Sequence, residues 1–298
     1  MRAAPQKEPV FAIVYGPSSY GKTVDAGYAF PNALFVCKTG GTKSIVSQCG
    51  YQPATLAHTT LDDAAKVLQQ HAKSYDAVVV DEFDFLVEDT MNALGRRFTG
   101  FKLFGELRKS VMNFRNVARD CGVHVLLTAL ERGPKVRDDG VKVRGGPALT
   151  GDLPEKLPAM CDLVLRAARG EAGGIRPWPG VYRLDSNSQD WVGKDRDGGT
   201  PDPAPMNIGE ILRLNGYTVS RMASAPWQEA LVERLTENLM PLDDAAIREM
   251  ASQQFLTLAQ KVPPALAKWT VRDAIDRTIL YKAKSARAAS FYADTPLI

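Results

Sequence analysis

Eight consecutive residues near the start of the chain carry groups that could bind a phosphate chain. Gly16, Pro17, Ser18, Ser19, Tyr20, Gly21, Lys22 and Thr23 fit the pattern G-x-x-x-x-G-K-[ST]. The glycines allow a turn whose backbone N–H groups point at a phosphate, and a helix starting near Gly21 adds the positive end of its dipole. Lys22 supplies a cation for the β- and γ-phosphates, and Thr23 offers a hydroxyl to Mg²⁺. We therefore expect ATP and Mg²⁺ to bind this segment.

The stretches on either side of the segment are those that such a loop requires. Residues 10–15 are apolar, β-branched or aromatic, and this pattern predicts a strand buried on both faces of a parallel sheet. A helical stretch then runs from about residue 21 to residue 30 and ends before Pro31 and Asn32. The alternative is an ordinary glycine turn between a strand and a helix, but this context favours a phosphate-binding loop.

Two acidic residues follow the third predicted strand. Residues 77–80 are all apolar, and Asp81 and Glu82 come directly after them. Asp81 could hold Mg²⁺ through a water molecule, and Glu82 could orient and deprotonate the water that attacks the γ-phosphate. The alternative for Asp81 is a helix N-cap that follows a strand.

The first half of the chain predicts an α/β fold. Strand-like runs alternate with helical stretches, which implies right-handed crossovers and a mainly parallel sheet flanked by helices on both faces. The runs that predict these strands are residues 10–15, 34–37, 77–80 and 123–130.

The later part of the chain changes character twice. Strand signals return at residues 162–167, 180–184 and 190–192. Because no long helices separate them, we expect an antiparallel extension at one edge of the sheet. From about residue 225 onward the pattern is purely helical. We therefore predict a nucleotide-binding domain at residues 1–205 and a small all-α C-terminal segment at residues 206–298.

Several stretches beyond the loop resemble one group of proteins. The V-V-V-D-E strand that ends at Glu82, and the P-A-L-T-G stretch at residues 147–151 that leads to D-L-V-L-R at residues 162–166, resemble phage-type RecA-like ATPases. This group includes the Sak-type ATPases of the AAA family, which are associated with recombination and annealing. The resemblance covers about residues 10–199. It implies a RecA-like P-loop NTPase fold, ATP hydrolysis, assembly into a homo-oligomeric ring or filament, and action on single-stranded DNA in recombination or replication.

The resemblance also implies roles for three further residues. Thr128 matches a polar residue at the end of the fourth strand that senses the γ-phosphate, and the alternative is a simple buried threonine. Lys194 and Arg196 resemble a Lys-x-Arg element that related hexamers insert into the nucleotide site of the neighbouring subunit. An arginine delivered in this way neutralises charge on the transferred phosphoryl group. The alternative for both residues is a solvated hairpin turn.

One position departs from the pattern of that group. Its second strand usually ends in a glutamate that activates water, whereas Lys38 stands here, followed by Thr39, Gly40 and Gly41. Unless Glu82 substitutes, hydrolysis should be slow or absent while nucleotide binding survives. This leaves a second hypothesis, a nucleotide-binding structural or assembly component of a virus particle or packaging apparatus. A small-molecule kinase is less favoured, because no arginine-rich lid is evident.

Composition limits the partners and the location of the protein. The 298 residues carry a net charge of +3, which is low for a domain that binds nucleic acid over a large footprint. No apolar run approaches the roughly 18 residues of a membrane-spanning helix, so we expect no membrane partner. The four cysteines form no C-x-x-C pair, which fits the cytoplasm, that of the host if a phage encodes the protein. The virion is the location under the second hypothesis.

Two basic stretches could contact a nucleic acid. Residues 131–146 contain lysines and arginines without interleaved aromatic residues, so they could follow phosphates but offer no stacking platform for bases. The alternative is a solvated hairpin. In the last helix we expect basic residues on a charged outer face, which needs no ligand to explain it. These residues are Arg272, Arg277, Lys282, Lys284 and Arg287.

Overall fold

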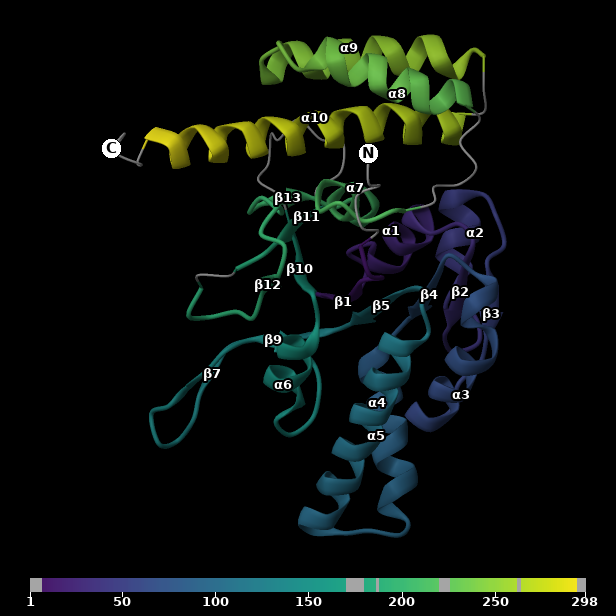
Figure 1. The fold of residues 1–298 in the computed structure, drawn as a ribbon, viewed down its shortest axis with the longest axis vertical. Coiled ribbons are helices and arrows are strands. Elements are labelled where there is room, and N and C mark those ends of the chain that lie inside the picture. Colours follow the sequence, from purple (N-terminus) through teal and green to yellow (C-terminus); the bar gives the residue numbers. More distant parts are fainter. Residues whose placement is uncertain (1–6, 170–179, 186–187, 220–225, 262–263, 294–298) are drawn as a thin grey trace, which may run out of the picture.

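A twisted sheet crosses the middle of the molecule and separates two groups of helices (Figure 1). The protein is described here from a computed structural model. The structure describes residues 7–169, 180–185, 188–219, 226–261 and 264–293. Within these ranges the main sheet has nine strands, and two further strand pairs lie outside it.

The main part of the sheet is parallel. Its strands occur in the order β3-β2-β4-β5-β1-β10, and each pairs with its neighbour in parallel register. Strand β5 therefore lies between β1, which precedes the glycine-rich segment, and β4, which precedes Asp81. The bounds are β1 (Phe11–Tyr15), β2 (Ala33–Val36), β3 (Ala54–Leu56), β4 (Ala77–Val80), β5 (His124–Ala129) and β10 (Leu163–Arg169).

An antiparallel extension continues the sheet beyond β10, as the late strand signals predicted. Strand β11 (Gly180–Arg183) pairs with β10, and β13 (Ala204–Pro205) pairs with β11. Strand β12 (Lys194–Asp195) also pairs with β10. The expected strand at residues 190–192 is wrong, because Trp191 makes only an isolated bridge to Gly145.

Side chains alternate between the two faces of the sheet, and each face has its own hydrophobic cluster. From β1, Ala12 and Val14 enter the cluster under α1, α2 and α7, whereas Ile13 and Tyr15 enter the cluster under α3 to α6. This two-sided burial is the reason that the strands read as continuous apolar runs. The helices are α1 (Lys22–Ala29), α2 (Lys43–Cys49), α3 (Leu61–His71), the short 3-10 turn η1 (Ala72–Ser74), α4 (Phe83–Gly95), α5 (Gly100–Asp120), α6 (Leu153–Met160) and α7 (Ile208–Leu214).

The last three helices lie together across one end of the sheet domain (Figure 1). They are α8 (Pro226–Leu239), α9 (Asp244–Ala259) and α10 (Pro264–Ala293), and they share a hydrophobic cluster of their own. Helix α10 also contacts α7 and β13, so it connects this unit to the sheet domain. The division at residue 205 stays a prediction, since α7 packs on α1 rather than within the three-helix cluster.

A narrow projection, residues 131–147, leaves the sheet directly after β5 (Figure 1). We call it the arm. It has two strand pairs: β6 (Glu131–Arg132) with β9 (Gly146–Pro147), and β7 (Lys135–Val136) with β8 (Lys142–Val143). Its outer part is exposed, including the apolar side chains of Val136 and Val141. The arm is therefore a built hairpin rather than an irregular loop.

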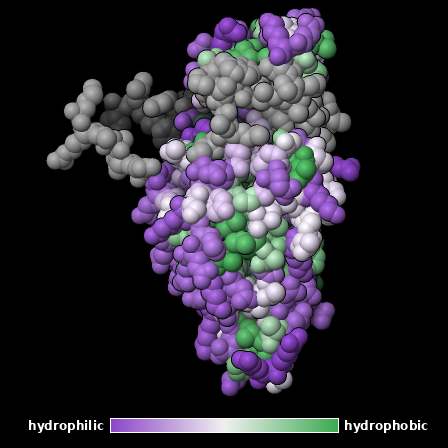
Figure 2. Space-filling view, turned by 90° about the vertical axis from the view of Figure 1, so that its right-hand side faces the viewer, coloured by the Kyte–Doolittle hydropathy of each residue, from purple (hydrophilic) through white to green (hydrophobic). Residues whose placement is uncertain are grey.

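The face drawn in Figure 2 is mainly polar. Figure 2 shows one face on which hydrophilic side chains predominate and hydrophobic side chains form smaller areas between them. Within the residues that the structure describes, none of the helices is long and apolar enough to cross a membrane. The α/β fold, its mainly parallel sheet, its antiparallel edge and its C-terminal helices are all as the sequence predicted.

Candidate nucleotide-binding site

The glycine-rich segment forms a loop between the carboxyl end of β1 and the first turn of α1. A side chain at position 16 would place its Cβ only 2.7 Å from the Ala167 carbonyl oxygen, so only glycine fits there. Gly21 has a φ of 86° and directly precedes the helix. The loop is thus held close to β10 on one side and leads into the amino end of a helix, where an anion is stabilised.

Lys22 lies over this loop. Its Nζ donates hydrogen bonds to the carbonyl oxygens of Gly16 at 2.8 Å and Pro17 at 2.7 Å. Burial lowers the pKa of Lys22, while the nearby carboxylates of Asp81, Asp84, Glu131 and Glu82 oppose that shift. A partly desolvated ammonium beside a loop of N–H groups is suited to binding the terminal phosphates of a nucleotide.

Thr23 and Asp81 meet beside the lysine, although they come from different elements. The Thr23 hydroxyl donates to both carboxylate oxygens of Asp81, at 2.9 and 3.2 Å. On the other side, the Thr128 hydroxyl donates to Asp81 Oδ1 at 2.5 Å. Burial raises the pKa of Asp81, and the two threonine hydroxyls act in the opposite direction. Strand order explains the meeting, because β1, β5 and β4 are adjacent and end at the same edge.

Glu82 occupies an unusual backbone conformation at this edge. Its φ of 58° and ψ of 49° lie in the left-handed region, which is costly for a residue other than glycine. Its N–H donates to the Thr128 hydroxyl at 3.1 Å, and its side chain is exposed. Strain of this kind concentrates at functional sites, so it supports a role for Glu82 beyond starting α4.

The residues present fit a magnesium ion. The Thr23 hydroxyl and the Asp81 carboxylate supply hard oxygen donors at hydrogen-bond distance from each other. Mg²⁺ binds through one or two such groups together with water and substrate phosphates. Thr23 and Asp81 are therefore the residues that would hold it.

A cavity of about 310 Å³ adjoins the loop on the side away from Asp81. Its wall includes Ser19 and Tyr20 of the loop and Arg169 at the end of β10. Because β10 and β4 lie on opposite sides of β1, the loop has Asp81 on one side and this cavity on the other. The cavity volume is within the range of small-molecule sites.

Lys194 and Arg196 lie away from this cluster. Strand β12 pairs antiparallel with the beginning of β10, which is the opposite edge of the sheet from the loop. Lys194 Nζ donates to the carbonyl oxygens of Ala159 and Cys161, and Arg196 pairs with Asp162 at 2.8 Å. The structure therefore does not bring either residue to the glycine-rich loop within one chain. Their action on a neighbouring subunit stays a prediction.

Sequence reasoning missed one residue of this region. Glu131, at the base of the arm, has a buried Oε2 without a hydrogen-bond partner among the described residues, and its carboxylate interacts electrostatically with Arg166 and Lys22. Its position directly after the fourth strand was the available signal. Lys38, by contrast, turns to Asp89 at 3.1 Å.

The expectation for the last helix was wrong at two positions. Arg272 and Arg277 are buried and ion-paired, rather than part of a charged outer face. Arg272 belongs to the wall of the cavity. The available signal was the sequence R-D-A-I-D-R at residues 272–277, whose mixture of opposite charges amphipathic spacing alone does not explain.

Comparison with known families agrees with this geometry. Residues 8–196, more than half of the chain, match the family described as AAA domain. The chain belongs to the AAA domain family. The matched range of this AAA domain contains the glycine-rich loop of residues 16–23, which we call the P-loop. It also contains Asp81, Thr128 and residues 194–196, and it ends before the C-terminal helices. A search of curated proteins found no match.

Solved structures also match this chain, 210 chains in all. One is a KaiC-like protein from the hyperthermophilic archaeon Pyrococcus horikoshii OT3, with 12% sequence identity and a TM-score of 0.39. The match covers 60% of this chain and 79% of the other.

Proposed function

We propose that the protein binds ATP with Mg²⁺ and hydrolyses it. The observation that carries this proposal is the convergence of Lys22, Thr23, Asp81 and Thr128 at one end of the P-loop. The loop amides and Lys22 hold the phosphates, and Thr23 and Asp81 hold the metal. When bound, Mg²⁺ neutralises charge on the β- and γ-phosphate oxygens.

Within this site, Glu82 is the residue that we assign to the attacking water. It directly follows Asp81, and Thr128 fixes its backbone through the 3.1 Å hydrogen bond. A carboxylate there accepts a proton from the water as the bond to the γ-phosphate forms. Thr128, which contacts both Asp81 and Glu82, would report the presence of that phosphate to β5 and the arm.

We further propose that the protein acts on single-stranded DNA as a homo-oligomer in phage-type recombination or replication. The arm supports this, because its exposed Lys135 and Arg137 lie on a projecting hairpin that begins three residues after Thr128. Cations on such a hairpin can follow phosphates in a sequence-independent way. The trans role of Lys194 and Arg196, and membership of the Sak-type group, belong to the same proposal.

The experiment is a comparison of wild type with Lys22→Ala. Calorimetry should detect ATP binding in the wild type and none in the variant, while Lys43→Ala, an exposed lysine of α2, should bind as the wild type does. Unchanged ATP affinity in Lys22→Ala would refute the site. Phosphate release with and without a single-stranded oligonucleotide then tests turnover and its stimulation by DNA.

A second function is supported by one observation. Lys38 stands after β2 and pairs with Asp89, so this position supplies no carboxylate to the nucleotide. A protein that binds ATP without turnover would be a structural or assembly component of a particle. Bound, unhydrolysed nucleotide and no effect of DNA in the same assay would favour this second function.

A further inference from the structure

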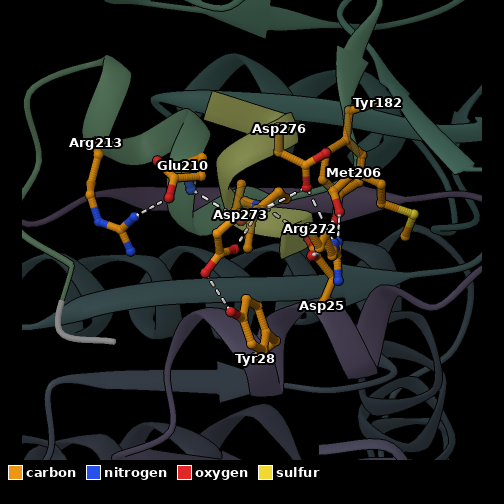
Figure 3. A network of polar contacts seen from close by, with 11 residues as sticks. Asp25, Tyr28, Tyr182, Met206, Glu210, Arg213, Arg272, Asp273 and Asp276 are labelled. Carbon is orange, nitrogen blue, oxygen red and sulfur yellow. Dashed lines mark hydrogen bonds and ion pairs between the residues drawn. The ribbon is translucent and has the colours of Figure 1, made fainter. Parts of the chain in front are cut away.

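Asp25 links the P-loop helix to three other elements. It lies on α1 two residues after Thr23 and is almost fully buried. One carboxylate oxygen accepts a hydrogen bond from Arg272 of α10 at 3.0 Å (Figure 3). The other accepts from the Tyr182 hydroxyl at 2.7 Å and from the Ile208 N–H at 2.9 Å. Strand β11 and helices α7 and α10 are therefore all fixed to the helix that begins the nucleotide site.

Arg272 is held from several directions. Its Nε contacts Asp276 Oδ2 at 3.2 Å, and it also donates to the Met206 carbonyl oxygen. Burial alone would lower the pKa of Arg272, but the carboxylates of Asp276, Asp25 and Asp273 outweigh it and raise that pKa. The side chain is thus a fixed cation with a defined direction, which Figure 3 shows reaching from α10 toward Asp25.

Arg272 and Asp25 are also part of the cavity wall beside the P-loop. The same wall contains Tyr20 and Met206, which offer apolar surface, and Gln48, which offers an amide. These are suitable contacts for a flat base and for ribose hydroxyls. Because the proposed function places the terminal phosphate beside Asp81, the nucleoside end would extend toward this cavity.

We propose that Arg272 is a positioning residue for the nucleoside end of the bound nucleotide, so that the C-terminal helix α10 is part of the nucleotide site. This inference rests on the proposed ATP binding. A buried ion pair is often no more stabilising than apolar side chains of similar volume, so stability alone does not account for it. Here the pair fixes one wall of the cavity, and it ties occupancy of that cavity to the placement of α10.

Arg277 provides a matched control on the same helix. It is also buried, and it pairs with Glu210 of α7 at 3.3 Å, but it is not part of the cavity wall. A general weakening of the attachment of α10 should therefore affect Arg272→Gln and Arg277→Gln alike. A role at the nucleoside end should affect only the first.

The test uses two probes, ATP and inorganic tripolyphosphate. The binding of each to the full chain is measured separately in the presence of Mg²⁺. Arg272→Gln should weaken ATP binding by about tenfold, which corresponds to about 1.4 kcal/mol, and leave tripolyphosphate binding within about twofold. Arg277→Gln should change neither. If the glutamine variant folds poorly, Arg272→Lys replaces it, because lysine keeps the charge balance of the network. This variant should also weaken ATP binding and leave tripolyphosphate binding unchanged.

Hydrogen exchange supplies a second readout. ATP should slow amide exchange in α10 around Arg272, and tripolyphosphate should not. If Lys22→Ala binds ATP normally, the proposed function fails. If Lys22→Ala binds neither probe, the proposed function stands. The role of Arg272 is then overturned if the Arg272 variants bind ATP as Arg277→Gln does, or if their binding of both probes weakens equally.

Discussion

The Thr128 hydroxyl donates a 2.5 Å hydrogen bond to Asp81 and at the same time accepts one from the N–H of Glu82. A single side chain on β5 therefore fixes both acidic residues that follow β4. Because β5 continues into the arm, only two residues separate this threonine from the first residue of the projecting hairpin.

Replacing Thr128 by valine should uncouple these groups. The variant keeps the shape but removes one hydroxyl donor from a buried carboxylate, which costs about 1 to 3 kcal/mol of unfolding free energy. Turnover should fall as well, because the Glu82 backbone loses its partner. Thr128→Ser is the control and should retain both properties. Equal denaturation midpoints and equal turnover for the two variants would contradict this account of Thr128.

Replacing Glu82 or Glu131 by glutamine should distinguish their roles in catalysis. Glu82→Gln should lower kcat by about 10² to 10⁴, the usual contribution of a general base, with ATP affinity nearly unchanged. Glu131→Gln removes a charge near Lys22 but should lower kcat by less than about tenfold. Single-turnover phosphate release measures both. The reverse order of effects would assign the attacking water to Glu131.

The pH dependence of stability should change in Asp81→Asn. Burial raises the pKa of Asp81 in the folded protein above its ordinary value of 3.8, so its contribution to stability is present below that value and is lost as the pH rises through the folded pKa. The asparagine variant has no such loss. It should be the more stable protein at pH 8, by about 1.4 kcal/mol for each unit of pKa shift, and the difference should vanish near pH 4.

Asp63 is a control for Asp81, because its pKa is shifted in the opposite direction. Hydrogen bonds from Thr59 and Thr60 lower its pKa, so its contribution is present above the unfolded pKa and is lost as the pH falls. Asp63→Asn should therefore destabilise the protein at pH 8. Thermal unfolding across pH 4 to 8 measures both variants, and the same sign for both would contradict the assignment.

Arg196 should act on turnover without a large effect on folding. Its side chain is 55% exposed, and Asp162 retains Arg119 at 2.7 Å when Arg196 is removed. Arg196→Ala should change stability by less than about 1 kcal/mol. If it acts in trans, mixing it with inactive Glu82→Gln should restore part of the turnover. Intact mixed assemblies that show no recovery would rule out the trans role.

The arm can be tested through the salt dependence of DNA binding. Replacing Lys135 and Arg137 by alanine removes two exposed cations. On single-stranded DNA each lost phosphate contact should reduce the slope of log affinity against log salt by about 0.7, and both together by about 1.4. Fluorescence titration at several salt concentrations measures the slope. The double variant Lys66→Ala and Lys109→Ala, on α3 and α5, should leave it unchanged.

The local sequence pattern was sufficient to predict that the P-loop and Asp81 lie at the same edge of the sheet. The P-loop and Asp81 follow short, uniformly apolar strands, and a parallel sheet places the carboxyl ends of such strands together. Helix α1 (Lys22–Ala29) was also predicted, as the helical stretch from about residue 21 to residue 30. Strand β3 was not predicted, since three residues with partial burial carry too little pattern.

The burial of the α10 arginines was missed because their ion-pair partners are distant in the sequence. Arg272 follows Val271 in a helix whose charged residues suggested a solvated face. Helix α10 is instead covered on two sides, by α8 and α9 and by α7 and β13, so its arginines meet carboxylates of distant segments. Asp25 and Arg272 are separated by 247 positions, and no local spacing rule relates them.

Helix α10 has thirty residues and runs without a break, which makes it about 45 Å long. Its anchor at Arg272 lies nearer to its beginning than to its end, with the longer portion extending beyond. Under the proposed role of Arg272, the helix would be fixed at the cavity beside the P-loop, with its longer portion free to tilt about that point. A tilt of about 5° there would swing the far end by about 3 Å, enough to make or break a contact with whatever lies beside it.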